Sequence, residues 1–199
     1  VFAALGAHRR PVLHGQLADA LEGGDPRLQD PHMLLRQLEA AGQTARAGAQ
    51  AERAALLARE ALAFEQAAGL YRAALRLGRH SDDARRALHV NLGDALANAG
   101  RCAEAAEAFF AAAEGAEAAS RLEYRRRAAE QLLLSGHVDR GLSELRAVLA
   151  EVKLAVPETP RRALAALVWQ RFKLRLRGIG WKPRDLSQIS RQDLERLEL

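Results

Sequence analysis

Six histidines and one cysteine are the residues of this chain that could bind a metal ion or act as a nucleophile. No two histidines lie four positions apart, the spacing that places two imidazoles on one face of a helix, and no cysteine lies near any of them. The histidines are His8, His14, His32, His80, His89 and His137. We therefore expect no metal site. Cys102 follows a turn, and we expect it to be a packing thiol and not a reactive one.

The acidic run Ser81-Asp82-Asp83 could bind a cation, but it also has the composition of a helix start. A serine or aspartate there accepts a hydrogen bond from a free backbone N–H, and acidic side chains interact favourably with the helix dipole. We interpret the run as the N-cap of a helix that begins near Asp83. The sequence holds no phosphate-binding loop, no kinase catalytic motif and no acid/base or nucleophile constellation, so we expect neither enzymatic activity nor a cofactor in this segment.

The composition indicates which elements position these side chains. Of the 199 residues 49% are hydrophobic but only 5% are aromatic, and alanine, the best helix former, is abundant while β-branched residues are sparse. The sequence therefore predicts an all-α fold. The net charge of +5 comes mostly from arginine and is weak evidence for a nucleic-acid partner.

The sequence also gives expectations about the cellular compartment and about a longer parent protein. A single cysteine excludes an internal disulfide and fits a reducing compartment, so we expect a cytoplasmic protein. No run of 18 apolar residues or signal peptide is present, and we expect no membrane span. The sequence begins at Val1 and ends at Leu199 inside a segment with a helical pattern, so we interpret it as part of a longer protein.

A repeated unit is clearest between residues 86 and 115. Small Gly93 and Ala105 allow two antiparallel helices to approach closely, Phe109 fills the space between them, and Gly100 supplies the left-handed residue that ends the first helix. The equivalent small residues Ala67, Ala105 and Gly141 lie 38 and 36 positions apart. This near-constant period predicts repeats over residues 28–156.

The unit resembles the tetratricopeptide repeat, which has Leu-Gly on its first helix and Ala-x3-Phe on its second. The resemblance implies antiparallel helix pairs stacked as a right-handed α-solenoid. This sequence departs from the repeat pattern at three positions, where His89 replaces a tryptophan, Leu96 a tyrosine and Glu117 a closing proline.

Three further helices are predicted before the clearest unit. Pro11 to Glu22 has a helical pattern, and Asp30 before Pro31 is a good N-cap for a helix that ends at Gly42. A longer helix, roughly residues 44–61, is expected to pair with the helices on both sides of it.

Stretches at both ends resemble large bacterial signalling ATPases of the STAND/AAA type. Val1-Phe2-Ala3-Ala4-Leu5 is similar to the end of their winged-helix segment, and Leu174-Arg175-Leu176-Arg177-Gly178 is similar to the variant fused to a Ser/Thr protein kinase. The resemblance implies that residues 1–27 are the end of an upstream ATPase module with its linking helix. It also implies that ATP and magnesium would bind only in parent domains outside this sequence.

The resemblance to tetratricopeptide repeats also suggests a groove. Tetratricopeptide proteins that clamp a peptide's C-terminal carboxylate use basic and asparagine side chains on the first helices, and Asn91 and Arg127 match two such positions. Glu52, Leu56 and Glu123 occupy the other three, so we expect a different peptide or domain to bind there. The candidate groove residues are Val90, Asn91, Asp94 and Arg127.

Residues 157–199 form a basic helical extension. From Thr159 to Arg184 there are eight basic residues and no acidic one. They are Arg161, Arg162, Arg171, Lys173, Arg175, Arg177, Lys182 and Arg184. An apolar stripe on the same helix consists of Leu164, Val168, Phe172 and Leu176. We interpret it as a capping helix that buries this stripe on the last repeat, with arginine stems covering it; docking to an acidic protein surface, to a membrane or to nucleic acid are the alternatives.

These observations predict an interaction and regulatory scaffold of a larger signal-transduction ATPase or kinase. Its partner would be a protein, a peptide or the parent's own ATPase or kinase domain, and no metal is expected. The alternative is a nucleic-acid-binding accessory segment that uses the basic helix 161–184, in which case binding should fall steeply as salt rises.

Overall fold

The computed structural model describes residues 9–24, 30–152, 154 and 159–177, and all regular secondary structure within these ranges is α-helical. The all-α prediction is therefore confirmed. The helices are α1 Arg9–Glu22, α2 Pro31–Ala40, α3 Thr44–Glu60, α4 Phe64–Leu77, α5 Asp82–Asn98, α6 Cys102–Ala113, α7 Ala118–Leu134, α8 Val138–Glu151 and α9 Pro160–Arg177. None of these helices is both long enough and apolar enough to cross a bilayer.

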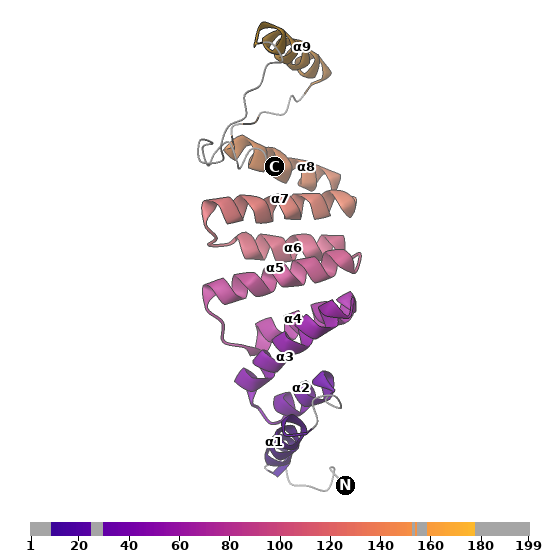
Figure 1. Ribbon diagram of the computed structural model, residues 1–199, viewed down its shortest axis with the longest axis vertical. Coiled ribbons are helices and arrows are strands. Elements are labelled where there is room, and N and C mark those ends of the chain that lie inside the picture. The colour runs from indigo at the N-terminus through magenta and orange to yellow at the C-terminus, as the bar shows by residue number, and fades with distance from the viewer. Residues whose placement is uncertain (1–8, 25–29, 153, 155–158, 178–199) are drawn as a thin grey trace.

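Helices α1 to α8 are stacked in the order of the sequence. Each helix from α2 to α7 packs against the helix before it and the helix after it in the chain, while α1 packs on α2 and α8 packs on α7. Figure 1 shows the result as a single column that begins with α1 and continues through α8. The predicted pairing of residues 44–61 with both neighbours is confirmed, because α3 packs on α2 and on α4.

The helices recur with the period expected from the small residues. The helices α3, α5 and α7 each have 17 residues and begin at Thr44, Asp82 and Ala118, which are 38 and 36 positions apart. Their partners α4, α6 and α8 begin at residues 64, 102 and 138, with the same two spacings. The helix predicted over roughly residues 44–61 is, as expected, longer than α1 and α2, and it has the same length as its equivalents α5 and α7.

Helix starts and turns follow the predicted chemistry. The carboxylate of Asp30 accepts a hydrogen bond of 2.9 Å from the backbone N–H of His32, and the hydroxyl of Ser81 accepts one of 3.3 Å from that of Ala84. Gly100 has a φ of 76° and, as predicted, provides the left-handed residue after the first helix of its unit. The equivalent position of the preceding unit is Leu62, with a φ of 59°.

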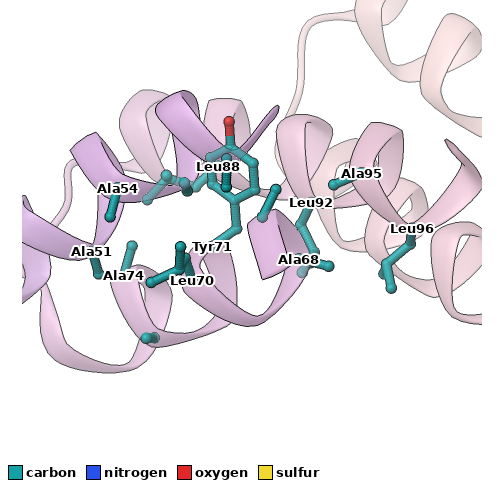
Figure 2. Packing of buried hydrophobic residues seen from close by; sticks show 14 of the residues in the cluster. Ala51, Ala54, Ala68, Leu70, Tyr71, Ala74, Leu88, Leu92, Ala95 and Leu96 are labelled. Atoms are coloured by element: carbon teal, nitrogen blue, oxygen red, sulfur yellow. The ribbon is translucent and has the colours of Figure 1, made fainter. Parts of the chain in front are cut away.

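The core is built mainly of alanine, with a few large side chains between the helices. The largest fully buried ones are Tyr71, Phe109, Leu38, Leu88, Leu96, Leu132 and Val148. Figure 2 shows Tyr71 among alanines and leucines of α3, α4 and α5. A Cβ on Gly93 would lie 2.6 Å from Cε1 of Phe109, so the predicted close approach at Gly93 is confirmed.

Exposed ion pairs connect alternate helices along the stack. Arg76 of α4 binds Glu39 of α2, with Nη2 2.8 Å from Oε1, and Arg140 of α8 binds Glu107 of α6 at 2.5 Å. Because at least one side chain of each pair is largely exposed, these pairs contribute little stability individually.

Helix α9 confirms that the basic extension contains a helix, but this helix does not cap the stack. Every residue from Pro160 to Arg177 is exposed. The stripe of Leu164, Val168, Phe172 and Leu176 is therefore not buried on the last repeat, and the capping interpretation is wrong for the described residues. Its length and caps are local properties, whereas its burial depends on a partner that the stack does not supply.

Candidate functional site

Four side chains meet on one side of the stack. They come from α3, α5 and α7, which are the first helices of three consecutive helix pairs. Arg59 of α3 donates a hydrogen bond from Nη1 to Oδ1 of Asn91 in α5, over 3.2 Å. Nη2 of Arg127 in α7 donates to Oδ1 of Asp94, also in α5. Asn91 and Asp94 lie one helical turn apart in α5. Asn91 links α5 to α3, and Asp94 links α5 to α7. We call Arg59, Asn91, Asp94 and Arg127 the polar row.

Arg127 has a second contact that fixes its guanidinium. Its Cζ lies 4.1 Å from the centroid of the Phe109 ring, which is almost fully buried in α6. The side chains of Arg127 and Asp94 are 27% and 35% exposed, so the ion pair is only partly screened by solvent. A guanidinium held between a carboxylate and an aromatic face is a well-oriented donor.

Tyr71 of α4 lies beneath this row. Its side chain is 0% exposed, and its hydroxyl has no hydrogen-bond partner among the described residues. Burial raises the pKa of the Tyr71 hydroxyl, while the charge of Arg59 lowers it and the charges of Glu52 and Asp94 raise it. The hydroxyl is therefore within electrostatic reach of the row, and Figure 2 shows its oxygen pointing away from Leu70 and Ala74.

The chemistry available here is recognition by hydrogen bonds. The row presents two guanidinium groups, one carboxylate and one amide, and the Tyr71 hydroxyl can both donate and accept. The described residues contain no group of three or more His, Cys, Asp or Glu side chains that could hold a metal ion.

The structure brings together three of the four predicted groove residues. Asn91, Asp94 and Arg127 are in the row, whereas Val90 is partly buried and packs against the core. Glu123, at one of the unmatched clamp positions, binds Arg126 of its own helix, with two oxygens 2.8 Å from two guanidinium nitrogens.

Sequence reasoning missed Arg59 and the role of Tyr71. A signal for Tyr71 was present, because it lies four positions after Ala67, as Phe109 does after Ala105 and Leu145 after Gly141. Of these three equivalent residues only the tyrosine carries a polar atom. That atom has no hydrogen-bond partner among the described residues.

Two other residues that the sequence analysis considered, Cys102 and His89, are not part of the polar row. Cys102, the first residue of α6, is a half-buried free thiol. His89 of α5 has a buried Nδ1 with no hydrogen-bond partner in the described part of the chain. Burial lowers the pKa of His89, the positive charge of Arg85 lowers it further, and Glu114 raises it.

The predicted basic surface is only partly described. Six of its residues are exposed on α9, while Lys182 and Arg184 lie outside the described residues, as does the segment Val1 to Leu5. The six are Arg161, Arg162, Arg171, Lys173, Arg175 and Arg177.

Comparisons of the chain with protein-family models, with curated proteins and with solved structures found no match.

Proposed function

We propose that this chain is a protein-interaction scaffold in which a peptide or domain binds across α3, α5 and α7 at the polar row. The observation that carries the proposal is the buried hydroxyl of Tyr71 beneath the row, which has no partner among the described residues. In the same proposal the helix pairs are tetratricopeptide-like repeats stacked as a right-handed α-solenoid. The scaffold would then be a regulatory part of a larger bacterial signalling ATPase or kinase in the cytoplasm.

The argument begins with the energetic cost of Tyr71. Burying a hydroxyl without a hydrogen bond costs about 1–3 kcal/mol, and a phenylalanine in the same place would avoid that cost. The next repeat has Phe109 at the equivalent position, so the packing itself does not need the oxygen. Because the hydroxyl is fully covered in the unbound chain, a ligand that offers a donor or acceptor would bond to it only after the covering side chains move aside, and would then compensate for its burial.

The arrangement of the row supports a ligand that is extended along the stack. Its residues come from three successive first helices, and it includes charges of both signs. A peptide has N–H and C=O groups at regular intervals and can therefore match donors and acceptors on several repeats at once. Binding of one of the parent's own domains here would allow regulation by a shift between docked and undocked states.

The experiment is a selection of random displayed peptides on the 199-residue chain, followed by affinity measurements on the selected peptides. We expect Tyr71→Phe to weaken binding about tenfold, the effect of losing one hydrogen bond, while it leaves the fold intact or stabilises it. Asn91→Ala should weaken binding as well. Arg146→Ala, an exposed position on α8, is the matched control and should have no effect.

Two results would contradict the proposal. In the first, the selected peptides bind the Tyr71→Phe and Asn91→Ala variants as tightly as the unsubstituted chain. In the second, no peptide is enriched. Tight binding of ATP to this chain in calorimetry would argue against a scaffold without its own nucleotide site.

A further inference from the structure

Helix α9 combines strong positive charge with complete exposure. It has six basic residues and no acidic one, and all of its 18 residues are exposed. Six positive charges exceed the net charge of +5 of the whole chain, so the other residues together carry a net charge of −1. The positive character of the chain is thus concentrated on one helix.

The same helix exposes an unusual amount of apolar surface. Seven large hydrophobic side chains are between 51% and 73% exposed, namely Leu164, Leu167, Val168, Trp169, Phe172, Leu174 and Leu176. One side of the helix has a shallow apolar hollow lined by Leu164, Ala165, Val168, Trp169, Phe172 and, from the first turn, Arg161. Contiguous exposed apolar surface of this kind marks interaction sites, and a helix of this length is only marginally stable without packing.

The apolar residues form two strips and not a single face. At ~100° per residue, Leu164, Val168, Phe172, Leu176 and Trp169 form one strip, and Leu167 with Leu174 forms the other. Arg171 lies in the narrower gap between the strips and Arg175 lies inside the first strip, while Arg162, Lys173 and Arg177 lie in the wider gap. An occupant that buries both strips must therefore enclose the helix and neutralise cations at the borders.

This pattern favours one kind of occupant over three others. A membrane surface needs cations opposite a single apolar face, which α9 lacks. A second copy of α9 would bring six more cations against the first six and repel it. Nucleic acid would neutralise the cations but leave the apolar strips in water, and Trp169 and Phe172 stack on each other, with centroids 6.0 Å apart, where bases would need them separate.

We propose that α9 docks as a helix into an acidic, apolar cleft of a protein partner. Carboxylates at the rim of the cleft would pair with Arg171, Lys173 and Arg175, and its apolar walls would cover both strips. Lys173 already lies 5.6 Å from the Trp169 ring, so its ammonium is directed over the aromatic side that a partner would bury. This site is separate from the polar row, and each can be tested without the other.

The test uses the 199-residue chain carrying Trp181→Phe, so that Trp169 is its sole tryptophan. The probe is Ca²⁺-loaded calmodulin, an acidic protein that encloses basic apolar helices in hydrophobic grooves; the Ca²⁺-free form, whose grooves are closed, is the control. We expect saturable micromolar binding of the Ca²⁺-loaded form with a blue shift of Trp169 emission. Binding should weaken at least tenfold in R171E/R175E and in Phe172→Ser, but not in Arg146→Glu on α8 or in Tyr71→Phe.

Parallel titrations use vesicles containing anionic phosphatidylserine and a 20-base-pair DNA duplex. The proposal is overturned if calmodulin does not bind, if both α9 variants bind it unchanged, or if vesicles or DNA bind more tightly than calmodulin. Because the substituted α9 side chains are exposed, unchanged circular dichroism and thermal midpoints will show that the stack remains folded in the two α9 variants.

Discussion

The guanidinium of Arg127 in α7 lies over the ring of Phe109 in α6, with 4.1 Å between its Cζ and the ring centroid. The same guanidinium contacts the carboxylate of Asp94 in α5. One side chain therefore connects three consecutive helices. It joins the polar surface of the first helices to the apolar packing between the repeats.

Replacing Arg127 by alanine should lower the free energy of unfolding by about 1–2 kcal/mol, because both the ion pair and the cation–π contact are lost. Arg127→Lys should cost less, since it keeps the charge but not the planar stacking. Urea denaturation measures both variants, with Arg146→Ala as the control. An Arg127→Ala chain as stable as the control would show that the two contacts contribute nothing.

Glycines at helix contacts should not tolerate a methyl group. A Cβ on Gly48 would lie 2.6 Å from the Cα of Gly78, which is backbone and cannot rotate away. We expect Gly48→Ala to destabilise the chain by about 1–3 kcal/mol. Gly69→Ala on α4 is the matched control: no atom beyond its own turn lies within 4 Å of the added Cβ, and it should stabilise by about 0.5–1 kcal/mol. Thermal unfolding of the two variants should therefore shift in opposite directions.

Leu62 is the residue to replace for added stability. It has a φ of 59°, and the equivalent Gly100 and Gly136 have values of 76° and 82°. Since a left-handed conformation costs a side-chain-bearing residue about 1 kcal/mol, Leu62→Gly should raise the free energy of unfolding by up to about that amount. Leu62→Ala retains the strain and should not. The expectation fails if the alanine and glycine variants denature at the same urea concentration.

His89 should make stability depend on pH. Burial and the nearby charge of Arg85 lower its pKa, so the folded state favours the neutral imidazole. The stabilisation is therefore present above the unfolded pKa of about 6.5 and is lost as the pH falls through the folded value. Denaturation between pH 7.5 and 5 should show this loss in the unsubstituted chain and a smaller one in His89→Gln. Identical pH profiles would assign the dependence to other groups.

The sequence allowed prediction of those features that depend on local chemistry. Helix starts follow from caps such as Asp30 and Ser81, and the period follows from small residues such as Ala67 and Ala105, because each is set by contacts within a turn or between adjacent helices. The pairs Arg59–Asn91 and Asp94–Arg127 join residues 32 and 33 positions apart. Whether such side chains meet depends on the rotation of each helix about its axis, which the whole core determines.

Helix α9 also shows that a local sequence pattern predicts a helix but not what packs against it. The pattern of Leu164, Val168, Phe172 and Leu176 correctly predicts a helix, but it does not specify what packs on the apolar stripe. Burial on the last repeat was the economical expectation, and the exposure of α9 contradicts it. Tyr71 is similar, since its position in the repeat is visible in the sequence while the missing partner of its hydroxyl emerges only from the packed structure.

The order of helix packing has a consequence for how this molecule opens and closes. From α1 to α8, each helix packs on its neighbours in the sequence, so the terminal helices are held on one side and the central ones on two. Amide protons should then exchange fastest in α1 and α8, with slower exchange towards α5. The helix that bears Asn91 and Asp94 is thus in the part of the stack that melts last.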